Sequence, residues 1–241
     1  MLHHTRGIVL HTIPYSDSSL IAKIYTEQFG LQSYIVSGAR SKRGKAKGNL
    51  LQPLMQVELV VQHKAKSRLQ RIMEIGCKAP YRHIHEDIVK TSIALFLAEV
   101  LYKAIREEEK NPGLFEFLSH SLQILDLETG SCHNFHLCFL LQLSRYLGFF
   151  PHSAESPAHK IFDLQEGVFR ATEPHHPYFL EPELGEKLLR LMQTNYENMQ
   201  EFTIGNLDRR RLLERLLWYY EMHLENMRDV KSHKVLEEVM G

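Results

Sequence analysis

Several features that carry enzymatic chemistry are missing from this 241-residue sequence. Its three cysteines, Cys77, Cys132 and Cys138, form no CxxC pair, which excludes a disulfide framework and is typical of a reducing cytosol. There is no Walker loop, no GxSxG, no HExxH and no pair of acids at catalytic spacing. The sequence therefore gives no support to an enzyme.

Long hydrophobic runs are also missing. Uninterrupted apolar stretches such as Ile93–Ala98 are far too short to cross a bilayer. The first residues, MLHHTRGIVLHT, lack the cationic and then apolar layout of a signal peptide. An apolar content of 44% is nevertheless enough for a real core. We expect a soluble protein of the cytoplasm.

Acidic residues are absent between Glu27 and Glu58, and this gap contains the most unusual stretch of the chain. Gly38–Gly48 reads GARSKRGKAKG, and its glycines predict neither a strand nor a stable helix. Its cations are Arg40, Lys42, Arg43, Lys45 and Lys47. A loop with such unbalanced charge suits contact with a polyanion, and the plainer alternative is a solvated loop kept basic for solubility.

The zero formal net charge hides an asymmetry between two halves. Residues 1–80 hold 12 Lys+Arg and 4 Asp+Glu, a balance of +8, whereas residues 81–241 hold 17 and 25, a balance of −8. Such asymmetry predicts two domains, 1–80 and 81–241, of which the first meets an anionic partner.

The first 80 residues are β-rich, with turn-like spacers between short alternating segments. The expected strands are Gly7–Ile13, Leu20–Glu27, Leu31–Ser37, Gln56–Gln62 and Leu69–Ile75. Five short strands with one long loop between the third and fourth favour an oligonucleotide-binding (OB) barrel, with an SH3-like barrel as the alternative.

Beyond Pro80 the apolar period becomes helical, so we expect an α+β protein in which a barrel precedes an all-helical domain. The expected helices cover residues 86–106, 111–127, 132–147, 183–199 and 207–227, with a short or frayed one from Lys231. An irregular insert at about 149–182, rich in proline, interrupts them and contains a hairpin-like segment around Ile161–Phe169.

More cations and some aromatic residues belong to the predicted barrel. Cations that neutralise phosphates and aromatic rings on which bases stack are the ingredients of single-strand binding. The cations flank the last turn of the barrel and are Lys64, Lys66, Arg68 and Arg71. The aromatic residues are Tyr15, Tyr25 and Tyr34, each of which could equally belong to the barrel core or its rim.

Two clusters in the second half can each be interpreted as a functional site or as ordinary structural residues. Cys132, His136 and Cys138 could suggest zinc, but Cys138 would point away from the other two on a helix, which favours buried thiols. A run of arginines opposes the dipole at a helix start, so it indicates either a partner or a solvated face with an Arg210–Glu214 pair. The run is Arg209, Arg210, Arg211 and Arg215.

The residues already quoted resemble a known family. TRGIVLHTIPYSDSSLIAKIYTEQFG at 5–30, VSGARSKRGK at 36–45 and LQPL at 51–54 resemble the amino-terminal domain of RecO, a bacterial recombination mediator. The similarity continues through LSRYLGFFP at 143–151 and through LLWYYEMHLENMRDVKSHKVLEEV at 216–239, so it spans nearly the whole chain.

The resemblance implies an OB barrel joined to a helical domain. It also implies binding of single- and double-stranded DNA, annealing of complementary strands, and loading of RecA together with RecR and single-strand-binding protein, without catalysis. Many members carry four zinc-binding cysteines after the LGxxP turn, but residues 152–179 here contain none. We therefore expect no metal and no cofactor.

The resemblance also implies a site for the acidic, apolar-ended tail of single-strand-binding protein. Arg209, Arg210, Arg211 and Arg215 adjoin an apolar stripe at the start of the 207–227 helix, so we expect this tail there. Two rival functions remain open at this point. One is an RNA-binding translation adaptor, and the other is a metal-dependent nuclease that uses carboxylates of the second half.

Overall fold

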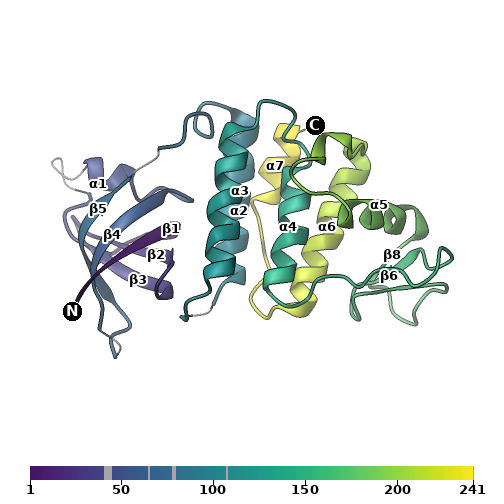
Figure 1. Ribbon diagram of the computed structural model, residues 1–241, viewed down its shortest axis with the longest axis horizontal. Helices are drawn as coiled ribbons and strands as arrows, with labels where there is room; N and C mark the ends of the chain where they lie inside the picture. Colours follow the sequence, from purple (N-terminus) through teal and green to yellow (C-terminus); the bar gives the residue numbers. More distant parts are fainter. Residues whose placement is uncertain (41–44, 65, 78–79, 107, 241) are drawn as a thin grey trace. The chain divides into compact units, whose positions relative to one another are not determined.

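The computed structural model describes residues 1–40, 45–64, 66–77, 80–106 and 108–240, without the side chain of Lys45 (Figure 1). It contains two compact units, Met1–Leu127 and Glu128–Gly241, which are described separately below. The predicted domain boundary near residue 80 stays a prediction. No helix in the described ranges is long and apolar enough to span a membrane.

A closed five-stranded barrel opens the first unit, in the strand order β1-β2-β3-β5-β4. Its strands are β1 (Leu2–Pro14), β2 (Leu20–Thr26), β3 (Gly30–Val36), β4 (Gln56–Gln62) and β5 (Gln70–Gly76). All neighbouring pairs are antiparallel except β3 and β5. This five-stranded closure is the OB barrel, so the predicted fold is confirmed and the SH3-like alternative is set aside.

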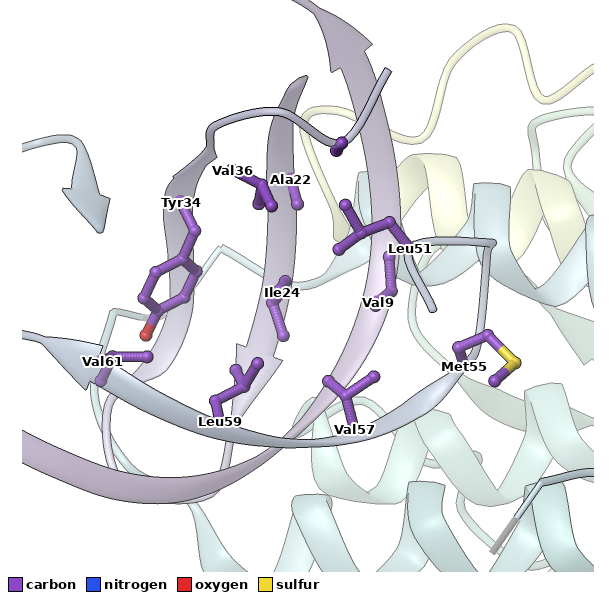
Figure 2. Close-up of a cluster of buried hydrophobic side chains, with 11 residues drawn as sticks. Val9, Ala22, Ile24, Tyr34, Val36, Leu51, Met55, Val57, Leu59 and Val61 are labelled. Atoms are coloured by element: carbon purple, nitrogen blue, oxygen red, sulfur yellow. The ribbon is translucent and has the colours of Figure 1, made fainter. Parts of the chain in front are cut away.

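The barrel core is built from the inward positions of alternating strands. Figure 2 shows Val9, Ile24, Val57 and Leu59 pointing into a common interior, and all four are buried. Tyr34 lies in the same cluster with no exposed surface. The half-buried pattern predicted for the fourth strand is thus the one that fills the barrel.

One prediction for the basic segment is wrong. A short helix, α1 (Lys45–Asn49), forms inside the stretch that we expected to contain no helix. It packs close to the end of β3, because a Cβ atom on Gly48 would lie 2.9 Å from the Ala39 carbonyl oxygen. Lys42 and Arg43 lie outside the described residues.

Two helices complete the first unit, α2 (Ile88–Ala104) and α3 (Pro112–Leu127). Asp87 caps α2 by accepting hydrogen bonds from the backbone N–H groups of Val89 and Lys90. The chain between the barrel and α2 is held by Asp126 of α3, which accepts three backbone N–H groups from residues 82–84 at 2.8–3.0 Å. We call this contact the Asp126 clasp.

The second unit consists of helices and a small sheet that lies beside α5. Its helices are α4 (Phe135–Tyr146), α5 (Pro182–Met192), η2 (Met199–Glu201, 3₁₀), α6 (Asn206–His223) and α7 (His233–Met240). The predicted helix 183–199 is therefore shorter than expected, since α5 ends at Met192. The irregular insert contains a three-stranded sheet in the order β7-β6-β8: β6 (Ile161–Asp163), β7 (Val168–Arg170) and β8 (Phe179–Leu180).

Close packing holds this small sheet against α5. A Cβ atom added to Gly185 would lie 1.8 Å from the carbonyl oxygen of Lys160, so only glycine fits where the helix passes the start of β6. Asp163 of β6 is buried, accepts the backbone N–H groups of Gln165 and Glu166, and pairs with Arg170 at 2.9 Å. The turn between β6 and β7 is thereby fixed without a metal-binding thiolate.

Candidate nucleic-acid interface

Strand register places the cation-bearing loops at the two ends of the barrel. The first residue of β2, Leu20, pairs with Val36 at the end of β3, and Ile35 beside it pairs with Arg71 at the start of β5. Arg71 in turn pairs with Gln62 at the end of β4. The end of β4 also pairs with the start of β1, whereas the β1–β2 loop follows the end of β1. The β1–β2 loop and the segment after β3 therefore leave the barrel at one end, and the β4–β5 loop leaves it at the other.

Together these loops carry most of the cations that the sequence singled out, and we call these exposed cations the basic rim. Its described members are Arg40, Lys64, Lys66, Arg68 and Arg71, all exposed. Within the described part of the chain, the side chains of the last four make no hydrogen bond or ion pair. They are free to exchange solvent ions for phosphates, as nucleic-acid binding requires.

Arg40 is the exception, because it fastens the start of the basic segment to the β1–β2 loop. Its guanidinium donates a 2.9 Å hydrogen bond to the carbonyl oxygen of Ser16, and its backbone N–H donates to that of Ser18 at 3.0 Å. Lys47, in α1, is exposed on the chain that returns from the same segment. Arg40 thus joins two of the three loops.

The β4–β5 loop has an internal scaffold that presents its lysines and arginine outward. The Gln70 side chain is buried and accepts the Lys64 backbone N–H at 2.8 Å. Its amide nitrogen donates to the carbonyl oxygens of Lys64 and Ser67 at 2.9 and 2.7 Å. One buried amide therefore satisfies the backbone of the turn, and the charged side chains remain in solvent.

The three tyrosines differ in exposure, since two are buried and one is exposed. Tyr25 and Tyr34 have no exposed surface, and burial raises the pKa of Tyr34 to about 12. Both are core residues. Tyr15 lies in the β1–β2 loop at the basic rim, and 58% of its surface is exposed. Only Tyr15 of the three is placed to stack on a base.

Two other cations of the barrel, Lys23 and Arg6, were not singled out from the sequence, and of these two only Lys23 is left without a carboxylate partner in the described residues. Lys23 points outward from β2, opposite Ser33 of β3, on the sheet face that OB barrels use for ligands. Its alternation with the apolar Ala22 and Ile24 could have identified it as an outward-facing cation. Arg6 is held by Glu27 at 2.8 Å and by Glu116, and these pairs, the Glu27 hydrogen bond foremost, raise its pKa.

The suspected zinc residues are packing residues. Cys132, His136 and Cys138 are buried, and burial lowers the pKa of His136 to about 3 and raises the pKa of Cys138 to about 12. A protonated thiol is a poor metal ligand. In the described part of the chain, no three His, Cys, Asp or Glu side chains lie close enough to hold a metal ion.

The arginines of α6 are held by the second unit itself. Arg209 donates to Asn134 at 3.1 Å, to Asn206 at 2.7 Å and to the Ile204 carbonyl oxygen at 3.2 Å, and burial lowers its pKa. Arg211 lies 3.6 Å from Glu181 and 3.7 Å from Asp208.

The other two arginines of the run have partners as well. Arg210 donates to the Glu237 carbonyl oxygen of α7 at 3.2 Å, whereas one of the two interpretations of the sequence paired it with Glu214. Arg215 lies 3.8 Å from Glu181. The adjoining stripe, Leu213, Leu216 and Leu217, is buried.

Two family models match the chain. "Recombination protein O N terminal" matches residues 1–81, and "Recombination protein O C terminal" matches residues 85–233. The DNA repair protein RecO of Phocaeicola vulgatus is 42% identical over 241 residues, all of both chains. Those of Bacteroides fragilis and Porphyromonas gingivalis are 41% and 34% identical, over 99% and 98% of each chain. With matches over its full length, this chain belongs to the RecO family of DNA repair proteins.

Proposed function

We propose that this chain is a non-catalytic DNA-binding protein that anneals complementary strands in recombinational repair. The observation that supports the proposal is the set of exposed cations on the β1–β2 side and on the β4–β5 loop of the OB barrel, the loops that with the strand 2–3 face bind oligonucleotides in this fold. The DNA-contacting residues of the proposal are Arg40, Lys42, Arg43, Lys45, Lys47, Lys64, Lys66, Arg68 and Arg71. The protein acts in the cytoplasm, on the nucleoid.

Annealing follows from electrostatics. Two complementary strands repel each other through their phosphates. At 0.1 M salt this repulsion is largely screened only beyond about 10 Å, so it persists when the strands come close. Cations on exposed loops neutralise phosphates of both strands and release their counterions, so the strands approach at lower cost. Because the cations lie on exposed loops at both ends of the barrel, a strand that crosses between them is held along its backbone with its bases left available for pairing.

The proposal includes the partners RecR and single-strand-binding protein and the loading of RecA. For the acidic tail of single-strand-binding protein, the proposed contacts are Arg209, Arg210, Arg211 and Arg215. Of these, Arg210 is the most solvent-exposed, and Arg209 is the most engaged within the unit. Titration of a tail peptide into the wild type and an Arg210→Glu/Arg211→Glu double variant tests this site, and equal affinity would refute it.

The test of the main proposal is annealing of two labelled complementary oligonucleotides in the presence of a chelator. We expect the wild type to accelerate pairing, and the Lys42→Glu/Arg43→Glu/Lys45→Glu variant to lose most of the acceleration while keeping its unfolding midpoint. Strand cleavage that the chelator abolishes would support a nuclease instead. Preference for RNA in competition would support an RNA-binding adaptor.

The mediator function needs a separate measurement. Annealing of DNA coated with single-strand-binding protein is measured with and without RecR. We expect the coated strands to anneal with this protein present, and RecR to change the rate. An identical rate with and without RecR would remove RecR from the proposal and leave the annealing activity intact.

A further inference from the structure

The only tryptophan of the chain is exposed on α6, although the apolar residues next to it in the helix are buried. Trp218 of α6 keeps 41% of its surface exposed, whereas its neighbours Leu216, Leu217, Tyr219 and Tyr220 are all buried. A large aromatic ring left in solvent beside such a packed stripe does not serve the core. Exposed tryptophan is instead typical of a binding surface.

Trp218 forms one wall of a hollow of about 370 Å³ in the second unit. The hollow is lined by Gln165, Tyr178, Trp218, Glu221, Met222 and Arg228. Tyr178 supplies a second exposed ring, with 40% of its surface in solvent. Two aromatic rings, a thioether, an amide and charged groups of both signs therefore meet at one place, which we call the Trp218 hollow.

The walls of the Trp218 hollow are fixed before any ligand arrives. Asp163 accepts the Gln165 backbone N–H at 3.0 Å, so the turn that carries Gln165 is held by a buried carboxylate. The Tyr178 carbonyl oxygen accepts the Leu164 N–H at 3.0 Å. Trp218 itself lies within a regular helix. A preorganised site loses little entropy on binding.

One cation lies against the indole, and a second lines the hollow. The Arg215 guanidinium carbon is 4.4 Å from the centroid of the Trp218 ring, and Arg228 is among the lining residues. A flat ring backed by a guanidinium is the arrangement on which nucleobases stack, and Gln165 offers a donor and an acceptor for a base edge. Glu221 is the one carboxylate in the lining.

We propose that the Trp218 hollow binds an unpaired base of single-stranded nucleic acid, as a second contact in addition to the basic rim. The inference rests on the proposed function, since a strand held at the barrel raises the effective concentration of its remaining bases. Flat rings beside an amide and two arginines fit a base better than they fit a wide apolar protein face. Because the second unit is acidic overall, stacking contributes more here than phosphate contacts.

Since Trp218 is the sole tryptophan, its emission reports this hollow alone. Oligo-dT of about 30 nucleotides is titrated into the full-length protein, with intrinsic fluorescence and the anisotropy of labelled DNA followed together. We expect emission to be quenched along the same curve as the anisotropy. Anisotropy that saturates while emission stays constant would overturn this inference and leave the proposed function standing. If neither signal changes, the proposed function itself fails.

A matched pair of variants provides an independent test. Tyr178 and Tyr146 are both 40% exposed in the second unit, but only Tyr178 lines the hollow. We expect Tyr178→Ala and Trp218→Ala each to weaken oligo-dT binding about five-fold or more, the low end of the loss for one stacked base. Tyr146→Ala should leave binding unchanged. Equal effects of Tyr178→Ala and Tyr146→Ala would contradict the proposal.

The salt dependence of binding distinguishes the contact at the basic rim from the contact in the Trp218 hollow. Binding at the basic rim weakens steeply with salt, whereas stacking in the Trp218 hollow does not. The ratio of wild-type to Trp218→Ala affinity should therefore stay constant, or rise, between about 50 and 200 mM salt. A ratio that falls to one would mean that the hollow acts through charge alone, and would overturn the stacking proposal.

Discussion

The two groups of cations in this protein contrast in what their side chains contact. Lys64, Arg68 and Arg71 of the basic rim extend into solvent from a loop and strand whose backbone is satisfied elsewhere. Arg209 of α6 is half-buried and donates to two side chains and one carbonyl oxygen. A cluster of positive charge therefore indicates a binding surface only when its hydrogen bonds are not already used to hold the fold.

The largest effect that tests this contrast concerns DNA affinity. Reversal of three rim charges, Lys64→Glu/Arg68→Glu/Arg71→Glu, should weaken binding of single strands on the order of 100-fold at low salt, at about 1 kcal/mol for each ion pair. The log–log salt slope should become shallower by about 2, for three lost phosphate contacts. Fluorescence anisotropy at several salt concentrations measures both.

The control for the rim variant reverses charges outside the barrel. Arg106 and Lys110 are exposed between α2 and α3, so Arg106→Glu/Lys110→Glu should change affinity much less. The rim variant should also keep its unfolding midpoint, because exposed substitutions cost within about 0.5 kcal/mol each. A salt slope equal to that of the wild type would remove the β4–β5 loop from the interface.

The next largest effect concerns stability and tests Asp126, a carboxylate whose hydrogen bonds lie within the first unit. Asp126→Asn should destabilise the first unit by about 2–3 kcal/mol, because a charged acceptor of three backbone N–H groups becomes a weaker one. Burial would raise the pKa of Asp126, but the N–H groups of residues 82–84 outweigh it and lower the pKa. Urea unfolding of the wild type and the variant measures the difference.

The same carboxylate gives a pH dependence with a definite sign. A lowered folded-state pKa contributes stability above the unfolded pKa of about 3.9, and that stability is lost as the pH falls through the lower folded value. The gap in stability between wild type and Asp126→Asn should therefore narrow below about pH 4. A gap that is constant from pH 7 to pH 3 would show that the charge of Asp126 does not carry the clasp.

The reverse experiment on α6 should affect stability and leave DNA affinity nearly unchanged. Arg209→Ala removes three donors and leaves Asn134 and the Ile204 carbonyl oxygen with fewer partners, which should cost about 1–3 kcal/mol. Chemical unfolding and DNA anisotropy are measured on the same variant. A large loss of DNA affinity without loss of stability would remove the contrast between the two cation groups.

The smallest effect concerns the tyrosines. Tyr34→Phe should leave DNA affinity unchanged, since the ring is fully buried in the barrel, whereas Tyr15→Ala should lower it a few-fold. Anisotropy with oligo-dT compares the two. Reduced affinity in Tyr34→Phe at unchanged stability would mean that the barrel opens to admit a base.

Local patterns predicted much of the barrel. The strand Gln56–Gln62 was predicted with its observed bounds, because one buried face forces strict alternation. The helix α1 was missed, since five residues that include Gly48 carry no apolar period. The end of the barrel from which each loop leaves depends on which strands pair, and neither β3 nor β5 alone shows the register between them.

The sites in the second unit were harder to predict for the same reason. The partner that holds Arg209, Asn134, lies 75 residues earlier in the chain, so the sequence shows the positive charge but not its acceptor. Trp218 likewise follows an apolar stripe that makes it look like one more core residue. Exposure and long-range pairing decide both cases, and neither is local.

The Asp126 clasp bears on where the amino-terminal domain can be truncated. The amino-terminal family model ends at residue 81, one residue before the backbone groups that Asp126 holds. Gln56 of β4 and Ser119 of α3 are also joined, at 2.7 Å, within the same compact unit. The segment matched by the family model is thus shorter than the compact unit, and we expect the shortest barrel fragment that folds on its own to end at Leu127.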